Sequence, residues 1–228
     1  AGACFAASIE HEHRAQPIRH VYLGQTPGSD WQVGIIEAGH TTDEYLVCEG
    51  VQAEEIAALL AADVIVARCV GPSEFGARAL GNRSILANPA NAANLKTIND
   101  AIKNRDFWMP FTPSILEEHI DMYMLNPKSL DVPYMTIGFE TTDAARTDLA
   151  AALHPGDFSA RPQAVKKSTN PEYWALIEAF RQKTGIPALL NTSLNLHGEP
   201  MNYSIAQAAR TVAKSELQVL VMPDNRLL

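Results

Sequence analysis

The chain has 228 residues, 46% of them hydrophobic and 19% charged, which is enough apolar material for one buried core of ordinary domain size. Its formal net charge of −8 argues against a nucleic acid or an anionic membrane as partner, because phosphate groups attract basic surfaces. The three cysteines have no C-x-x-C spacing, which argues against a disulfide scaffold and a structural zinc site. No apolar stretch approaches the length of a membrane span, and we expect a cytoplasmic protein.

Residues 1–39 are expected to be the tail of a preceding domain and a linker. Residues 1–8 are typical of the middle of a helix, which indicates a fragment of a longer protein. Residues 11–39 are polar and contain prolines and glycines, which favours an extended segment. His11 and His13 could offer two imidazoles to a metal, but a metal site needs further ligands at defined positions, so a solvated linker is the preferred interpretation.

Beyond residue 39 the hydrophobic period alternates between that of a helix and that of a strand, which is typical of an α/β layer architecture. The clearest helix begins at Pro171 and ends before Gly185. We expect helices at residues 53–62, 91–104, 143–153, 171–184 and 205–213, and strands at residues 64–70, 133–139, 161–165, 187–190 and 217–222.

Residues 71–89, GPSEFGARALGNRSILANP, form the most unusual stretch of the chain. Gly76 and Gly81 let the backbone approach a ligand closely, and Arg78 and Arg83 supply forked, always charged guanidinium groups. This combination is suited to bidentate pairing with a phosphate or a carboxylate. The alternative is a glycine-rich loop whose arginines pair with surface acids, and the spacing alone does not decide between the two.

A second group of cations, Lys103 and Arg105, lies where a predicted helix ends, close to Trp108 and Phe111. An aromatic and cationic loop suits the base and phosphates of a nucleotide. Cations at the end of a helix are also favoured by the helix dipole, so a structural role is the alternative.

Two further groups of polar residues follow or begin predicted strands. Asn191, Ser193 and Asn195 come directly after a buried strand, the position where α/β folds place ligands. Asn and Ser there could instead satisfy turn or helix-cap groups. Arg161 begins the short predicted strand in the segment SARPQ.

Four segments resemble, in order, the motifs of the O-carbamoyltransferase family, which includes the NodU-type nodulation proteins and the carbamoyltransferases that modify cephem and aminoglycoside antibiotics. Residues 71–89 resemble GRxEFGPRALGNRSILADP, and residues 102–118, IKNRDFWMPFTPSILEE, resemble IKxRExFRPFAPSVLEE. Residues 154–165, HPGDFSARPQAV, resemble HVDGTARPQTV, and residues 185–200, GIPALLNTSLNLHGEP, resemble GxPVLLNTSFNxxGEP. Together the four motifs are specific, whereas no single one would be.

The resemblance implies a YrdC-like domain over residues 40–228: a twisted mixed β-sheet surrounded by helices, with a concave nucleotide-binding face. In the family such a domain forms carbamoyl adenylate from carbamoyl phosphate and ATP, with Mg²⁺. A separate sugar-kinase-like N-terminal domain, which holds iron or a similar metal, then moves the carbamoyl group to a hydroxyl of a natural product or sugar. That N-terminal domain is the expected partner of this chain. In the chain itself we expect no set of metal ligands.

The resemblance also assigns roles to individual residues. It places three cations on the phosphates and the carbamoyl group and five further residues on the nucleotide. The catalytic candidates are Lys103, Arg78 and Arg161, and the nucleotide-binding candidates are Ser193, Asn191, Arg105, Asn195 and Arg83.

The chain departs from the family pattern at Met109, where the family has an arginine, and at Pro72 and Ala77. Loss of one phosphate-binding guanidinium weakens binding by about 1.5–3 kcal/mol, the scale of a charged hydrogen bond. The alternative function is therefore a non-catalytic nucleotide-binding or docking module of the same fold. RNA binding is a third reading, which the acidic balance disfavours.

Overall fold

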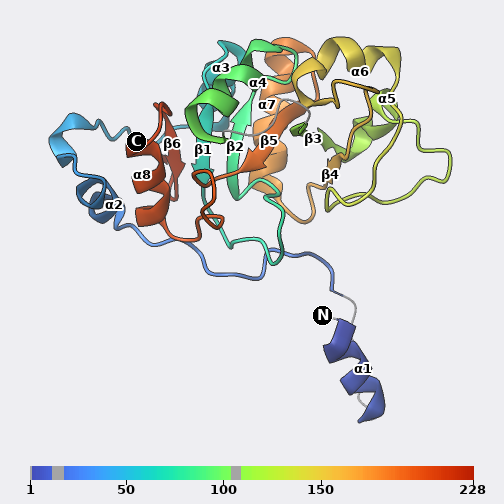
Figure 1. Cartoon of the computed structure of the whole chain (residues 1–228), viewed down its shortest axis with the longest axis horizontal. Helices are drawn as coiled ribbons and strands as arrows, with labels where there is room; N and C mark the ends of the chain where they lie inside the picture. Colours follow the sequence, from blue (N-terminus) through green and yellow to red (C-terminus); the bar gives the residue numbers. More distant parts are fainter. Residues whose placement is uncertain (1, 12–17, 104–108) are drawn as a thin grey trace.

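A computed structural model describes residues 2–11, 18–103 and 109–228. Its centre is one seven-stranded mixed sheet with the strand order β4-β3-β5-β2-β1-β6-β7, flanked by helices (Figure 1). This arrangement confirms the predicted α/β class and the mixed sheet. The strands are β1 Val66–Cys69, β2 Arg83–Ala87, β3 Thr112–Leu116, β4 Gln163–Val165, β5 Ala188–Ser193, β6 Leu220–Met222 and β7 Arg226–Leu227.

The four central strands of the sheet are antiparallel to their neighbours within the group, and one parallel strand is added on each side of them. Strand β2 lies antiparallel between β1 and β5, and β5 is antiparallel to β3. The pairs β1/β6 and β3/β4 are parallel, and β7 closes one edge antiparallel to β6. Because β2 and β5 are neighbours, the loop before β2 and the end of β5 meet at the same edge of the sheet.

The helices cover both faces of the sheet, and α1 lies apart from it in Figure 1. Helix α7 illustrates the local rules: its first residue is proline, the side chain of Asn170 caps the Tyr173 amide, and Gly185 ends it at φ 83°. The α-helices are α1 Gly2–Glu10, α2 Trp31–Glu37, α3 Ala53–Ala61, α4 Ala93–Ile98, α5 Ile120–Tyr123, α6 Asp143–Asp148, α7 Pro171–Thr184 and α8 Ile205–Ala213. Shorter turns are the 3₁₀ segments η1 Thr42–Glu44, η3 Glu117–His119 and η4 Ala150–Ala152, and the π-helical turn η2 Asn99–Lys103.

Side-chain alternation along the buried strands divides the core between the two faces of the sheet. Val66 and Leu86 pack with α3 and α7 on one face. Ala67 and Ile85 pack with α2 and α8 on the other. A third cluster around Ile115 lies under α5 and α6, at the end of the sheet with β4.

Three expectations about the elements are wrong. Residues 31–37, expected within a linker, form α2, whose Ile35 is fully buried in the core with α8. Residues 112–116, the first two of which were interpreted as the end of a loop with two prolines, form β3 in the sheet. Residues 133–139, expected as a strand, form turns with one isolated bridge at Phe139.

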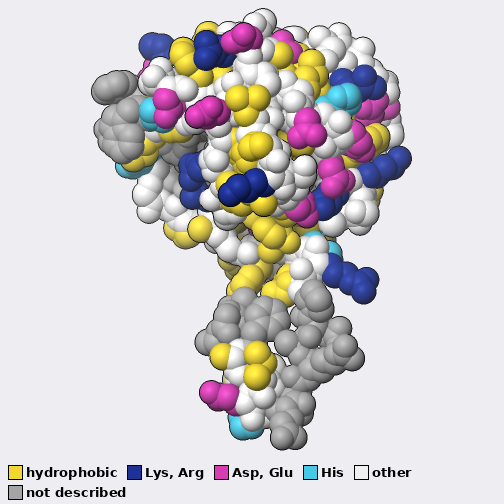
Figure 2. All heavy atoms as spheres, turned by 90° about the vertical axis from the view of Figure 1, so that its right-hand side faces the viewer, with side chains coloured by type: hydrophobic (Ala, Val, Ile, Leu, Met, Phe, Trp, Pro, Cys, Tyr) yellow, Lys and Arg dark blue, Asp and Glu magenta, His cyan; other side chains and the backbone are white. Residues whose placement is uncertain are grey.

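None of the helices in the described ranges is long and apolar enough to cross a membrane. On the face of the molecule shown in Figure 2, the side chains of Lys and Arg are scattered among those of Asp and Glu rather than gathered into a basic stripe.

Candidate anion-binding site

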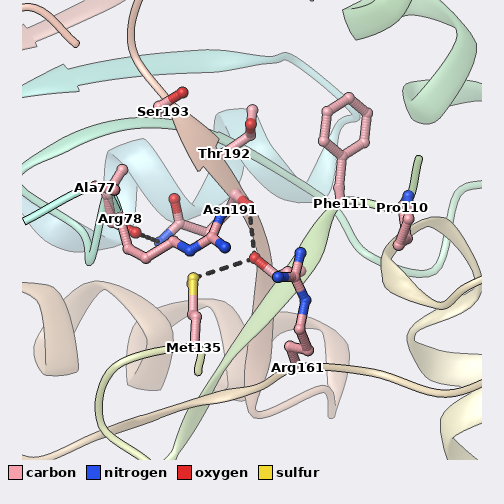
Figure 3. Close-up of a pocket in the computed structure, with 11 residues that line it drawn as sticks. Ala77, Arg78, Pro110, Phe111, Met135, Arg161, Asn191, Thr192 and Ser193 are labelled. Atoms are coloured by element: carbon pink, nitrogen blue, oxygen red, sulfur yellow. Dashed lines mark hydrogen bonds between the residues drawn. The ribbon is translucent and has the colours of Figure 1, made fainter. Parts of the chain in front are cut away.

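A cleft of about 110 Å³ opens between the glycine-rich loop before β2, the start of β3 and the end of β5 (Figure 3). It lies where the antiparallel neighbours β2, β5 and β3 bring their adjoining segments together. A cavity of this size holds a phosphate-sized group, and it is smaller than the 300–1,000 Å³ typical of sites for whole small molecules. The lining residues are Ala77, Arg78, Ala79, Pro110, Phe111, Thr112, Met135, Arg161, Asn191, Thr192 and Ser193.

Arg78 and Arg161 extend toward each other from two sides of this cleft (Figure 3). Partial burial and, second, the charge of Arg78 lower the pKa of Arg161. Within the part of the chain that the structure describes, neither guanidinium has a carboxylate or hydrogen-bond partner. Two like charges that share a cleft without a counter-ion repel each other, and a bound anion would remove that repulsion.

The loop that carries Arg78 is held in place by the buried carboxylate of Glu74. One oxygen of Glu74 accepts hydrogen bonds from the backbone amides of Leu80 at 2.7 Å, Asn82 at 2.9 Å and Arg83 at 3.3 Å. Gly81 has φ +116°, a conformation that favours glycine, and a Cβ there would lie 2.3 Å from the ring of Tyr173. The loop is therefore a fixed part of the fold.

Arg83 has a structural position, unlike the nucleotide contact expected for it. Its side chain is fully buried and does not line the cleft. The guanidinium donates to the carbonyls of Val70 at 2.7 Å, Gly71 at 3.0 Å, Gln25 at 3.0 Å and Tyr203 at 3.0 Å. These bonds use the donors that a phosphate would need, so in this structure Arg83 joins three segments of the backbone to β2.

A buried lysine meets two polar residues of β5 and the loop after it beside the cleft. Lys103 is 90 residues from Ser193 and 92 from Asn195 in the sequence, yet it contacts both. The ammonium group of Lys103, only 3% exposed, donates to Ser193 Oγ at 3.2 Å, to Asn195 Oδ1 at 2.7 Å and to both backbone carbonyls. Ser193 lines the cleft and Lys103 ends the π-helical turn η2, a distortion frequent at functional sites.

The exposed residue His197 ties the loop after β5 to this turn. Its backbone amide donates to the carbonyl of Ile102 at 3.2 Å, and its Nδ1 lies within hydrogen-bond distance of the carbonyl of Lys103. Glu199, two residues further along the same segment, forms an ion pair with Arg210 at 3.0 Å. Both residues therefore shape the loop that carries Ser193 and Asn195.

Asn191 also lines the cleft and is 1% exposed. Its Nδ2 donates to Ser114 Oγ at 2.9 Å and to the carbonyl of Ala79 at 3.3 Å, next to Arg78. The amide thus fixes the loop to β3 and β5 instead of pointing freely into the cleft. Ser114, in the segment TPSIL, was not singled out from the sequence, and only the pairing of β3 with β5 reveals its part.

Two other lining residues, Thr112 and Met135, carried no signal in the sequence. Thr112 Oγ1 donates to the carbonyl of Asn191 at 3.1 Å and contacts Met135 Sδ at 3.2 Å. Met135 adopts φ +55°, an uncommon value for a residue other than glycine, and is buried against the cleft. These two side chains close the wall between the arginines.

Arg105 and Trp108 lie outside the described residues, as does His13, the possible metal partner of His11. Met109, which replaces the arginine of the family pattern, is 37% exposed. The described residues contain no cluster of three or more His, Cys, Asp or Glu that could hold a metal ion.

Comparison with known proteins places these features in a family. The family described as Carbamoyltransferase C-terminus matches residues 57–227. The nodulation protein NolNO of Sinorhizobium fredii is 40% identical over 209 residues, which are 90% of this chain and 30% of that protein. The 3'-hydroxymethylcephem-O-carbamoyltransferase of Amycolatopsis lactamdurans is 36% identical over 146 residues, 64% of this chain and 27% of that protein. The chain belongs to the carbamoyltransferase C-terminal family, which confirms the resemblance seen in its motifs.

The chain spans about a third or less of the length of these relatives. Among solved structures, full-length HypF in its phosphate- and nucleotide-bound form covers 78% of this chain and 22% of its own, with 11% identity and a TM-score of 0.48. A similarity this distant supports no inference about the site.

Proposed function

We propose that this chain is the activating part of an O-carbamoyltransferase and forms carbamoyl adenylate from carbamoyl phosphate and ATP. One observation carries the proposal: Arg78 and Arg161 face each other across one cleft without a carboxylate partner among the described residues. A pair of uncompensated guanidiniums suits a small substrate with a phosphate group. Membership of the carbamoyltransferase family supports carbamoyl phosphate as that substrate.

The proposed chemistry is a transfer to the α-phosphorus of ATP. Water releases inorganic phosphate from carbamoyl phosphate, and the resulting carbamate attacks the α-phosphorus through oxygen. The bond between the α- and β-phosphates breaks, and pyrophosphate leaves with the electron pair. Because carbamate is already anionic, the adenylation step needs no general base. It does need positive charge where the nonbridging oxygens and pyrophosphate become more negative, which Arg78 and Arg161 supply.

Lys103, Ser193 and Asn195 form the second part of the proposed site. The lysine brings positive charge to the segment after β5 and orients the hydroxyl of Ser193, which lines the cleft. Asn191 keeps the end of β5 against the loop of Arg78. We propose that Ser193 and Asn195 contact the nucleotide, and that Arg105 adds a further contact.

Mg²⁺ would arrive with the triphosphate, whose oxygens supply its preferred ligands. The cleft is too small for a whole nucleotide, so the nucleoside would extend beyond it. We further propose that the sheet is YrdC-like and that this cleft belongs to its nucleotide-binding face.

The later transfer to a hydroxyl acceptor is proposed for the whole protein. The name of the relative from Amycolatopsis lactamdurans, 3'-hydroxymethylcephem-O-carbamoyltransferase, states its acceptor, and this chain matches 27% of that protein. By analogy, a sugar-kinase-like N-terminal domain with its own metal would bind the natural product or sugar and receive the activated carbamoyl group.

The alternative function is a nucleotide-binding or docking module without catalysis. Met109 favours it, since a methionine cannot replace the charge of the family arginine at that position.

Exchange of labelled pyrophosphate into ATP, with and without carbamoyl phosphate, tests the proposal. We expect exchange that requires carbamoyl phosphate, is lost in Arg161→Met and is retained in Arg181→Met, a matched control on α7 whose arginine pairs with Glu178 at 2.7 Å. A chain that binds ATP without exchange would support the non-catalytic module. A chain that binds neither ATP nor carbamoyl phosphate would refute both functions.

A further inference from the structure

The segment from Val21 to Gln25 carries no recognisable chemistry in the sequence and lies outside the 57–227 range of the family match. In the structure it runs along the glycine-rich loop. The amide of Phe75 donates to the carbonyl of Val21 at 2.6 Å, and Tyr22 forms an isolated antiparallel bridge with Glu74. The amide of Ser73 donates to the carbonyl of Gln25 at 3.0 Å. The start of the loop is therefore paired with this segment.

The side chain of Tyr22 reaches beneath the far end of the same loop. Its hydroxyl donates to the carbonyl of Leu80 at 2.8 Å and accepts from Gln163 Nε2 at 3.3 Å. Gln163 Nε2 also donates to the Leu80 carbonyl at 2.9 Å. Burial raises the pKa of Tyr22 to about 12, so the hydroxyl keeps its proton and remains a donor at neutral pH.

These contacts join the two segments that bear the facing arginines. Leu80 lies two residues after Arg78, and Gln163 lies two residues after Arg161. The hydroxyl of Tyr22 and the amide of Gln163 meet at one carbonyl, so they set the distance between the segments.

The network continues into the sheet below the cleft. Gln163 Oε1 accepts from Ser114 Oγ at 2.7 Å, and Ser114 Oγ accepts from Asn191 Nδ2 at 2.9 Å. Side chains from β3, β4 and β5 thereby hold the far end of the loop, and Tyr22 is the member of the network that comes from outside the sheet. Since all these groups are buried or half-buried, a lost bond is not readily replaced by water.

We propose that Tyr22 is a positioning residue for the anion site: its hydroxyl holds the Leu80 carbonyl so that Arg78 faces Arg161 at the separation a phosphate requires. The inference rests on the proposed function, because it supposes that the two arginines bind a phosphate group. It extends the site to a segment upstream of the family match. Misplacement by about 1 Å is enough to weaken a preorganised site strongly.

The test is Tyr22→Phe in the full chain, which removes the hydroxyl and keeps the ring. Inorganic pyrophosphate is the probe, and its Kd is measured by calorimetry. We expect the Kd to rise about three- to tenfold, the loss expected for one positioning hydrogen bond. The matched control is Tyr203→Phe, whose hydroxyl has no partner among the described residues and whose side chain is 53% exposed. Its Kd should equal that of the unchanged chain.

Kinetics separate positioning from a general loss of structure. In pyrophosphate exchange, Tyr22→Phe should raise the KM for carbamoyl phosphate while kcat stays within about twofold. A partly unfolded sample would instead lower kcat and leave KM unchanged. A second variant, Gly24→Ala, perturbs the same segment differently, since its new Cβ would lie 3.0 Å from the carbonyl oxygen of Ser73. It should weaken pyrophosphate binding in the same direction.

The outcomes distinguish this inference from the function on which it rests. If the unchanged chain does not bind pyrophosphate, the proposed function fails, and the inference fails with it. If the unchanged chain binds and both Tyr22→Phe and Gly24→Ala bind equally well, the positioning role is overturned while the function stands.

Discussion

Replacement of Arg161 by methionine should weaken substrate binding without lowering the stability of the fold. Most arginines with a partly buried side chain stabilise a protein through an ion pair or hydrogen bonds to carbonyls. Arg161 has neither among the described residues, and the charge of Arg78 acts against it. Methionine keeps much of the aliphatic length of the side chain and removes the charge, so the variant isolates the contribution of the guanidinium.

The two magnitudes differ enough to separate a binding residue from a structural one. A charged hydrogen bond to phosphate contributes about 1.5–3 kcal/mol, so the Kd for carbamoyl phosphate should rise about 10- to 150-fold. The free energy of unfolding should change by no more than about 0.5 kcal/mol, or about 1–2 °C in Tm for a chain of this size, with an increase expected if relief of repulsion dominates.

Calorimetric titration with carbamoyl phosphate and thermal unfolding of the same samples measure both quantities. Arg181→Met, on the surface of α7, controls for the loss of an arginine elsewhere. The reasoning is refuted if Arg161→Met lowers stability by more than about 1 kcal/mol while the Kd stays unchanged, because the guanidinium would then have a structural partner rather than a ligand.

Three further predictions test the fold. Arg83→Met should lower the urea midpoint strongly, by the equivalent of about 3 kcal/mol or more, because several buried carbonyls lose their donor; an unchanged midpoint would contradict the structural role. Gly81→Ala should cost more stability than Gly76→Ala, since both have positive φ but only the former would bring a Cβ to 2.3 Å from the ring of Tyr173; equal losses would show that backbone strain alone matters. Hydrogen bonds from the neighbouring arginine lower the pKa of Glu178 to about 2, below its ordinary 4.5, so this group stabilises the fold above about pH 4.5 and loses that effect as the pH falls toward 2. Urea unfolding of Glu178→Gln should therefore show a flatter pH dependence over this window, and an identical pH profile would mean that the pair contributes nothing.

The elements that were predicted correctly are those whose ends and periods are written locally. Helix α7 has a proline at its start, a glycine at its end and an apolar stripe between them, and it forms over the predicted residues. The glycine-rich loop was also evident, because two glycines and two arginines are unusual in one short stretch. Such features need no tertiary information.

The wrong elements depend on contacts that are distant in sequence. Residues 133–139 contain the β-branched and aromatic residues of a strand, yet Val132, Met135 and Phe139 are buried at spacings of three and four, which is not the alternation of a strand. The segment does contact the sheet, because the amide of Ala164 in the edge strand β4 donates to the carbonyl of Val132. This single bond stands where a regular neighbouring strand would form a ladder of bonds. Strand β3 was missed because Pro110 and Pro113 suggested a loop, whereas pairing with β5, which is distant in sequence, places residues 112–115 in the sheet.

The two arginines of the loop show what the sequence alone cannot distinguish. Arg78 and Arg83 are five residues apart in one motif, and both have the chemistry of a phosphate ligand. Arg83 lies within β2, so its side chain enters the core and finds the carbonyls of Gln25 and Tyr203, which are far away in sequence. Arg78 lies in the exposed part of the loop, two residues before the first backbone amide that Glu74 holds.

This division of labour explains how an uncompensated pair of charges can persist in the fold. The repulsion between Arg78 and Arg161 would push their segments apart if those segments were held only by the site itself. They are held instead by buried hydrogen bonds away from the guanidiniums. The loop amides donate to Glu74, and the side chains of Gln163 and Tyr22 donate to the carbonyl of Leu80. Binding energy from an anion is then not needed to assemble the cleft, so most of it remains available to hold the phosphate.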